Sequence, residues 1–366
     1  MHVRFLALDR QTARLRDELD TAVARVLESG RFVLGEELEG FEAEFAKFCG
    51  TRFAVGVASG TDALTIALQA VGVEPGDEVV TVANTCVPTI VGIEQAGARP
   101  VLVDVDPSTY TLDPDRLEEA LSARTKAVVP VHLYGQCADM DGILRLAGEA
   151  GVQVVEDCAQ AHGSAYRGRL AGALGRAAAF SFYPTKNLGA AGDAGAVTTD
   201  DPGVAEQARL LRNYGERERF HHVRRGRNSR LDPLQAAVLR TKLPHVERWN
   251  ERRREVAAVY TAALAGTAVR PPTEATERVH SYHLYVVRAP ERERFRTALL
   301  ERGVDTDVHY PLPVHRQPAY GDLAPAGRSL TVSEELSGSI VSLPLHAELT
   351  DEEVAHVAQS AALSAG

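Results

Sequence analysis

Two residues, Asp157 and Lys186, stand in settings that favour covalent chemistry. Asp157 ends the segment Val154–Asp157, whose valines are typical of a buried strand. Lys186 lies among small and hydroxylated residues in the segment Ser181–Gly189. A lysine of this kind can form a Schiff base with a carbonyl cofactor, and a buried aspartate can hold the proton of a pyridinium ring. Pyridoxal 5′-phosphate (PLP) chemistry requires this pairing.

A phosphate site is indicated by the turn Ser59–Leu64, which joins an expected strand to an expected helix. Free backbone N–H groups and a helix N-terminus favour an anion there, at Gly60 and Thr61. The Ser181 hydroxyl, a few residues before Lys186, can reach the same phosphate. Taken alone, a serine or threonine in such a turn is more often only a helix N-cap.

Three further polar residues fit such a pocket but have simpler explanations. Gln160, shortly after Asp157, can donate a hydrogen bond to a phenolic oxygen of the cofactor, although glutamine is common. Asn228 and Arg230 can contact a phosphate or lie on a polar loop before the helix at Pro233. A lone lysine in a glycine-flanked loop is usually solvated. The order and spacing of the whole set, not any single residue, indicate function.

Alternating strands and helices must position these residues. Short apolar runs separated by helical segments predict an α/β fold with a mainly parallel sheet covered on both faces. In such sheets ligands bind beyond the carboxyl ends of the strands, where Asp157 would lie. The expected strands are 53–57, 78–82, 101–105, 127–131, 152–156 and 180–182, after two amphipathic helices over 11–29 and up to about 48.

A second domain is expected after Leu243-Pro244, where a charged helical run begins. We predict a large domain over residues 1–245 and a smaller C-terminal α+β domain over 246–366. The smaller domain should contain strands at 282–287 and 304–309, and helices over 291–302 and from Asp351.

Composition narrows the class of protein. The chain has 366 residues, a formal net charge of −10 and four cysteines without CxxC spacing. The acidic balance argues against a nucleic-acid partner, despite an arginine cluster over 224–230. Single cysteines predict free thiols in a reducing compartment. The sequence has neither signal-peptide features nor an apolar run long enough for a membrane span, so we expect a cytoplasmic protein without membrane contact.

Motifs along nearly the whole chain resemble the DegT/DnrJ/EryC1/StrS family of sugar aminotransferases, which have the fold-type I PLP-dependent transferase (aspartate aminotransferase-like) fold. The matching segments are 30–35, 59–64, 131–135, 156–163, 181–189, 212–215, 228–237 and 309–311.

The resemblance implies a role for each matching residue. Lys186 corresponds to the Schiff-base lysine, Asp157 to the partner of the pyridine nitrogen and Gln160 to the contact with the cofactor's O3′. Gly60, Thr61 and Ser181 correspond to phosphate contacts. Asn228 matches a position from which the neighbouring subunit reaches that phosphate, which implies a homodimer with sites at its interface. The implied sugar contacts are Tyr183, Arg230, His309 and Tyr310.

One position departs from the pattern. Many relatives stack an aromatic residue on the cofactor ring from the segment that matches Thr85–Thr89, and this chain has Cys86 there. Either a smaller side chain covers the ring, or the correspondence is shifted by a residue or two.

The resemblance also implies the reaction. The cofactor would alternate between PLP and pyridoxamine 5′-phosphate in a ping-pong cycle, with L-glutamate as amino donor and a nucleotide-linked keto sugar as acceptor. The motifs look most like members that aminate C3 of dTDP-3-keto-6-deoxyhexoses in deoxyaminosugar biosynthesis. The alternatives are amination at C4 of an NDP-4-keto-6-deoxyhexose and amination of a keto-cyclitol.

Two other classes of protein share this scaffold. Relatives that dehydrate a sugar at C3 replace the lysine with histidine, so Lys186 argues against dehydration. A regulatory protein on a degenerate scaffold would not need to retain Asp157, Gln160 and Lys186.

Overall fold

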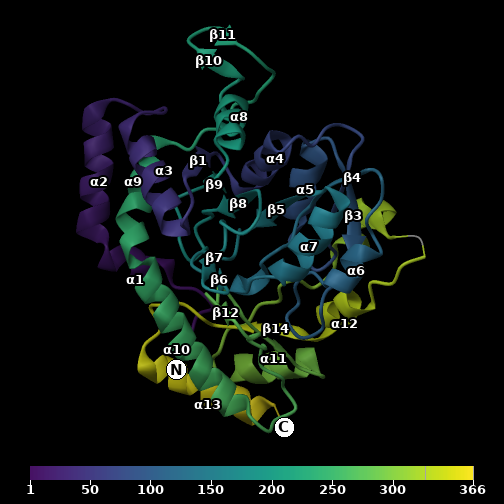
Figure 1. Ribbon diagram of the computed structural model, residues 1–366. Coiled ribbons are helices and arrows are strands. Elements are labelled where there is room, and N and C mark those ends of the chain that lie inside the picture. The colour runs from purple at the N-terminus through teal and green to yellow at the C-terminus, as the bar shows by residue number, and fades with distance from the viewer. Residues whose placement is uncertain (326, 366) are drawn as a thin grey trace.

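A seven-stranded sheet forms the centre of the computed structural model, which describes residues 1–325 and 327–365 (Figure 1). Its strands are β1 (Phe53–Val57), β2 (Glu78–Val82), β3 (Arg99–Val103), β4 (Thr125–Val128), β5 (Gln153–Asp157), β8 (Ala177–Ser181) and β9 (Gly195–Thr199). They lie in the order β1-β9-β8-β5-β4-β2-β3. Only β9 runs against its neighbours, so the sheet is mainly parallel, as predicted.

Helices cover both faces of this sheet. Val154 and Val155 are adjacent in β5, yet they belong to two different clusters of buried side chains, because successive residues of a strand point to opposite faces. The surrounding helices are α1 (Leu8–Arg14), α2 (Arg16–Ser29), α3 (Glu36–Cys49), α4 (Gly60–Ala70), α5 (Val87–Gln95), α6 (Pro114–Glu118), α7 (Met140–Ala150), α8 (Pro202–Arg212) and α9 (Pro233–Lys242).

A separate hydrophobic cluster unites both ends of the chain. It contains Val3, Val256, Leu299 and Val357. Its elements are α10 (Val246–Leu264), β13 (Tyr285–Arg288), α11 (Arg292–Glu301), β14 (Ile340–Leu343) and α13 (Asp351–Ser364). The start of α10 packs in the large core through Trp249. The division into domains at residue 245 stays a prediction.

The remaining elements are short. They comprise the strands β6 (Ala165–Tyr166), β7 (Arg169–Leu170), β10 (Glu216–Glu218), β11 (His221–His222) and β12 (Arg278–Val279), the helix α12 (Thr331–Ser339) and the 3-10 turns η1 (Leu133–Gly135), η2 (Leu243–His245), η3 (Val314–Arg316) and η4 (Pro318–Leu323). The hairpin β10–β11 projects from the body beyond α8, at the top of Figure 1.

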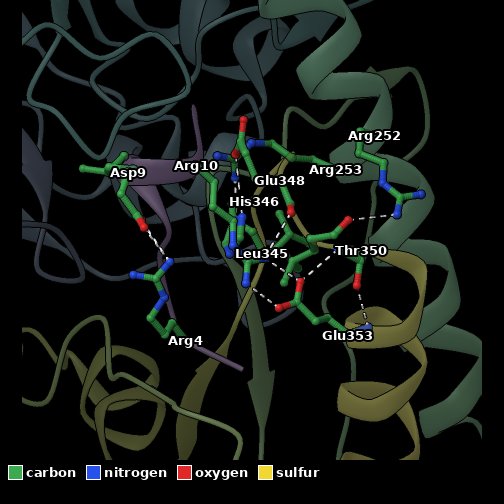
Figure 2. Close-up of polar contacts among 12 residues, drawn as sticks. Arg4, Asp9, Arg10, Arg252, Arg253, Leu345, His346, Glu348, Thr350 and Glu353 are labelled. Atoms are coloured by element: carbon green, nitrogen blue, oxygen red, sulfur yellow. Dashed lines mark hydrogen bonds and ion pairs between the residues drawn. The ribbon is translucent and has the colours of Figure 1, made fainter. Parts of the chain in front are cut away.

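The N-terminal segment is tied to the last helix by charged side chains (Figure 2). The Arg10 guanidinium donates to both carboxylate oxygens of Glu353, at 2.7 and 2.8 Å. Glu353 also closes a capping box with Thr350 at the start of α13. The Arg10 hydrogen bonds lower the pKa of Glu353 to about 2, so this carboxylate remains charged at neutral pH.

Several expected boundaries were wrong. The helix expected over 11–29 is divided into α1 and α2 at Leu15. The strand expected over 304–309 forms only isolated bridges, at Val304 and Asp307. Strands β9 and β14 were not predicted. In Gly195–Thr199 every residue is buried, so the alternating pattern of a half-buried strand is missing.

The four cysteines are free, and three of them are buried. None of the helices over residues 1–325 and 327–365 is both long and apolar enough to cross a membrane.

Glu156 is a completely buried carboxylate that holds several loops to β5. It accepts hydrogen bonds from the backbone N–H groups of Gly172, Leu174 and Gly175, at 2.8 to 2.9 Å. The His132 imidazole completes the set: its Nδ1 accepts from a backbone N–H, so its Nε2–H donates to Glu156 at 2.9 Å. Burial alone would raise the pKa of Glu156, but these donors lower it below the ordinary value.

Glu156→Gln should therefore lower the free energy of unfolding by about 2–4 kcal/mol. The amide carries no charge, and its NH₂ group would face the N–H donors that bond to the carboxylate in wild type. Urea denaturation at pH 7 measures the change, with the exposed Glu149→Gln as a control that should unfold like wild type. The pKa of Glu156 is lower in the folded state than in the unfolded state, so its contribution to stability is lost as the pH falls. The difference in unfolding free energy between wild type and Glu156→Gln should therefore narrow below about pH 4. Equal unfolding curves at pH 7 would contradict this role.

Candidate active site

One cavity of about 400 Å³ opens at the carboxyl ends of β5 and β8. It contains nine of the eleven residues selected from the sequence. They are Gly60, Thr61, Asp157, Gln160, Ser181, Tyr183, Lys186, His309 and Tyr310. Segments far apart in the chain thus meet where an α/β sheet is expected to bind its ligand.

Asp157, at the end of β5, is buried and held by two donors. Thr89 of α5 donates from its hydroxyl at 2.8 Å, and the backbone N–H of Ala159 donates at 3.1 Å. The Thr89 hydroxyl also lies 2.8 Å from that of Thr85, in the bend that precedes α5. These contacts fix the carboxylate and leave it able to accept a further proton donor from the cavity.

Lys186 enters the cavity from the loop that follows β8. Desolvation by burial lowers the pKa of its ammonium, while the neighbouring Cys86 and Asp157 act in the opposite direction. The loop is held by Lys242, whose buried ammonium donates to the Gly189 carbonyl at 2.8 Å. The lysine is thus partly shielded from water and set on a fixed backbone.

The N-terminus of α4 forms the anion-binding end of the cavity. Ser59 caps the helix by accepting from the backbone N–H of Asp62 at 3.1 Å. The N–H groups of Gly60 and Thr61 belong to the first turn, where the helix supplies no acceptor. A Cβ on Gly60 would lie 2.5 Å from the Cβ of Ser181, so only glycine lets this turn approach Ser181 so closely.

Gln160 and Tyr310 form one wall. The Gln160 amide oxygen accepts from the backbone N–H of Tyr134 at 2.7 Å, and its nitrogen donates to the Tyr310 hydroxyl at 3.1 Å. Cys86, at the start of α5, lines the cavity beside this hydroxyl, and burial raises the pKa of its thiol. Cys86, which stands in the segment where many relatives have a stacking aromatic residue, therefore forms part of this wall.

The two other expected sugar contacts sit at different depths. The His309 Nδ1 lies 2.8 Å from the Ser342 hydroxyl, and its ring stacks on Phe5 at 5.8 Å between centroids. Tyr183 is 53% exposed, so its ring stands at the mouth of the cavity. His309 is therefore held in place, whereas Tyr183 is free to contact a large ligand.

Asn228 and Arg230 do not line the cavity of their own chain. Asn228 forms a bridge with Asn213, and the Arg230 guanidinium donates to the Asn213 side chain at 2.9 Å. Arg230 also lies over the ring of Tyr214, at 5.6 Å from its centroid. Both residues follow the projecting hairpin β10–β11 along the chain.

Sequence reasoning missed three residues of the site: Thr89, Asn187 and His283. Thr85 precedes α5 and Thr89 lies in its first turn, so their spacing carried no helical signal, and only the fold brings their hydroxyls together. His283 lines the cavity, and the Asn187 side chain contacts the His283 ring. Neither residue stands in a sequence pattern that indicates catalysis or binding.

The residues present fit PLP. The cavity brings together an amine of lowered pKa, a fixed carboxylate and a helix N-terminus kept open by Gly60. These groups match the aldehyde, the ring nitrogen and the phosphate ester of the cofactor.

Comparison with known proteins agrees with this geometry. Residues 13–362 match the DegT/DnrJ/EryC1/StrS aminotransferase family. The chain is 50% identical to dTDP-3-amino-3,4,6-trideoxy-alpha-D-glucose transaminase of Streptomyces venezuelae over 344 residues, which cover 94% of this chain and 91% of the relative. It is 45% identical to dTDP-3-amino-3,6-dideoxy-alpha-D-galactopyranose transaminase of Aneurinibacillus thermoaerophilus, with 98% of each chain covered.

A solved structure, that of S. venezuelae DesV in complex with a ketimine intermediate, superposes with a TM-score of 0.97. The sequence identity is 48%, and the match covers 100% of this chain and 98% of that one. The fold is therefore that of the PLP-dependent sugar aminotransferases. Family match, identity and superposition agree, and the chain belongs to the DegT/DnrJ/EryC1/StrS aminotransferase family.

Proposed function

We propose that this protein is a PLP-dependent aminotransferase that moves an amino group from L-glutamate to the C3 ketone of a dTDP-3-keto-6-deoxyhexose. The observation that carries the proposal is the single cavity that joins Lys186, Asp157 and the open N-terminus of α4. The choice of acceptor is supported by the 50% and 45% identical relatives, both named for dTDP-3-amino sugars.

The residues of the cavity would hold the cofactor at three points. Asp157 would accept the proton of the pyridine nitrogen, with Thr89 fixing the carboxylate. The N–H groups of Gly60 and Thr61 and the hydroxyl of Ser181 would hold the phosphate. Gln160 would face O3′. When bound, PLP supplies an aldehyde that accepts the amino group and a ring that withdraws electrons from the reacting carbon.

Lys186 would move the protons. Its lowered pKa increases the fraction of neutral amine near pH 7, which is the form that acts as a base. Nζ would remove the proton from Cα of L-glutamate and, in the second half-reaction, deliver a proton to C3 of the sugar. The order would be ping-pong, because the cofactor keeps the amino group between the two half-reactions.

The sugar would enter past Tyr183, at the cavity mouth, and meet His309 and Tyr310 deeper inside. Amination at C4 of an NDP-4-keto-6-deoxyhexose, or of a keto-cyclitol, would need the same cofactor contacts. Which carbon is presented depends on how the ring is oriented between Tyr183 and Tyr310.

The active protein would be a homodimer. The hairpin β10–β11 projects from the body with Phe220 80% exposed at its turn (Figure 1). Such a large exposed aromatic favours burial against a partner. Asn228 and Arg230 lie outside their own cavity and next to this projection, which supports their reaching the phosphate or the substrate in the cavity of the second subunit.

Lys186→Ala should abolish covalent attachment of the cofactor and lower turnover about 10²–10⁴-fold, as expected for loss of a positioned acid–base group. Borohydride reduction and peptide mass spectrometry should find the cofactor on Lys186 in wild type only. The exposed Lys126→Ala is the matched control and should keep the modification at Lys186. Cofactor attached to another lysine in wild type would overturn the assignment.

Wild-type protein should aminate a C3-keto nucleotide sugar and leave its C4-keto isomer largely unreacted. The two sugars are offered separately with L-glutamate, and the products are identified by NMR. An amino group found at C4 would replace this substrate proposal with the C4 alternative.

Mixing two inactive variants tests the shared site. Asn228→Glu should weaken cofactor binding by placing a negative charge against the phosphate of the other subunit. In a mixed dimer with Lys186→Ala, one site carries both changes and the other carries neither. Activity should return when the two variants are co-expressed, whereas a site built within one chain would stay inactive in every combination.

A further inference from the structure

His283 is a buried histidine at the wall of the cavity, and none of the roles described so far uses it. It is 8% exposed and lies among the residues that line the cavity beside Lys186. The Arg253 guanidinium holds its backbone by donating to the carbonyls of Tyr282 and His283, at 3.1 and 3.3 Å. The backbone that carries the ring therefore has a fixed position at the wall of the cavity.

A chain of hydrogen bonds determines which nitrogen of this ring carries the proton. Asn250 donates to the His162 carbonyl at 2.8 Å, so its amide oxygen faces the other way, toward Asn187. Asn187 donates to that oxygen at 2.7 Å and to the Ser281 carbonyl at 2.9 Å. Both partners are acceptors only, so the amide nitrogen of Asn187 must point to them.

The amide oxygen of Asn187 then faces Nδ1 of His283 at 3.2 Å. An oxygen can only accept, so Nδ1 carries the hydrogen and Nε2 keeps its lone pair. Nε2 of His283 and Nζ of Lys186 have no hydrogen-bond partner among residues 1–325 and 327–365. One unpartnered acceptor and one unpartnered donor thus face the same cavity.

We propose that His283 is a positioning residue for Lys186: its Nε2 accepts a hydrogen bond from the lysine whenever the lysine is not attached to the cofactor. This inference rests on the proposed function, because only a lysine that alternates between attached and free states needs such an acceptor. Asn187, next to Lys186 in the chain, sets the tautomer and so links the lysine loop to the ring that receives it.

The surrounding charges are consistent with a neutral imidazole. Desolvation lowers the pKa of His283 well below its ordinary value, and the positive charges of Lys186 and Arg253 act in the same direction. Desolvation by burial also lowers the pKa values of His162 and His309, and the charge of Lys186 acts in the same direction. The other groups near the amine that can carry charge are Cys86, Asp157, Asp193 and Tyr310.

The acceptor has a definite effect on Lys186. A hydrogen bond from an ammonium is stronger than one from a neutral amine, so the acceptor favours the charged form. His283 should therefore raise the pKa of the free lysine, opposing the effect of burial. It would hold the lysine near the reacting carbon and keep available the proton that the lysine must deliver.

The pH dependence of amine labelling tests this. Protein is loaded with pyridoxamine 5′-phosphate, which leaves Lys186 free, and is treated with trace amine-reactive reagent across a pH series. Only four lysines are present, and the exposed Lys47 and Lys126 are internal references for mass spectrometry. In His283→Leu, labelling of Lys186 at pH 7 should rise about tenfold, a shift of the midpoint by about one pH unit.

Two matched variants separate the hydrogen bond from a change in polarity. His283→Gln offers an amide oxygen and should keep the midpoint near that of wild type. His162→Leu removes a buried imidazole whose ring nitrogens find no hydrogen-bond partner in the described part of the chain, so it alters polarity near the lysine but removes no acceptor bond. If His283→Leu does not fold, His283→Ala replaces it. An unchanged midpoint in the folded variant, or an equal shift in His162→Leu, would overturn the proposal.

Nitrogen-15 NMR of histidine-labelled protein gives an independent readout. In protein loaded with pyridoxamine 5′-phosphate, we expect Nδ1 of His283 to be protonated and Nε2 to be unprotonated at pH 7, with the Nε2 resonance shifting in Lys186→Ala. A proton on Nε2 would contradict the proposal. These measurements need no turnover, so failure to accept an amino group from L-glutamate would refute the proposed function without deciding the role of His283.

Discussion

The site depends on the geometry of two adjacent carboxylates at the end of β5. Neighbouring residues of a strand point to opposite faces, so Glu156 and Asp157 cannot serve the same environment. Glu156 points into the protein and collects N–H groups from the loop at 172–175 and from His132. Asp157 points into the cavity and is held by Thr89. The first carboxylate fixes the strand end on which the position of the second depends.

Lys186 and its neighbour Asn187 also have different roles in the site. Nζ of Lys186 has no hydrogen-bond partner among residues 1–325 and 327–365, while the side chain of its neighbour Asn187 bonds to Asn250, Ser281 and His283. Lys242 secures the end of the same loop through the Gly189 carbonyl. Polar groups of neighbouring loops therefore hold the backbone that carries the one amine that must remain mobile, and several of them come from the segments beyond residue 242.

The sequence predicted the mainly parallel sheet because its strands are short, apolar and separated by helices; β1 and β2 were predicted with their bounds unchanged. It also predicted the nine residues that share the cavity, through their resemblance to a family rather than through periodicity. It did not predict β9, whose residues are all buried and small or β-branched, or the strand β14.

Contacts between distant segments could not be predicted from spacing. The hydrogen bond between Thr89 and Asp157 joins the first turn of α5 to the end of β5, which only the fold brings together. The same holds for Asn187 and His283, since nothing in the sequence around His283 distinguishes it from a core histidine. Local sequence patterns identify residues that are able to take part in catalysis or binding, whereas tautomers and hydrogen-bond directions follow from tertiary packing.

The pairing of Val3 with residues 303–305 has a consequence for how the chain folds. The Val3 N–H donates to the Gly303 carbonyl, and the Val3 carbonyl accepts from the Asp305 N–H, inside the cluster that also holds Val357. This contact has a very high sequence separation, so its core closes only after distant parts of the chain have met. The large sheet around β1 to β9 can therefore form before the segment that precedes α1 docks.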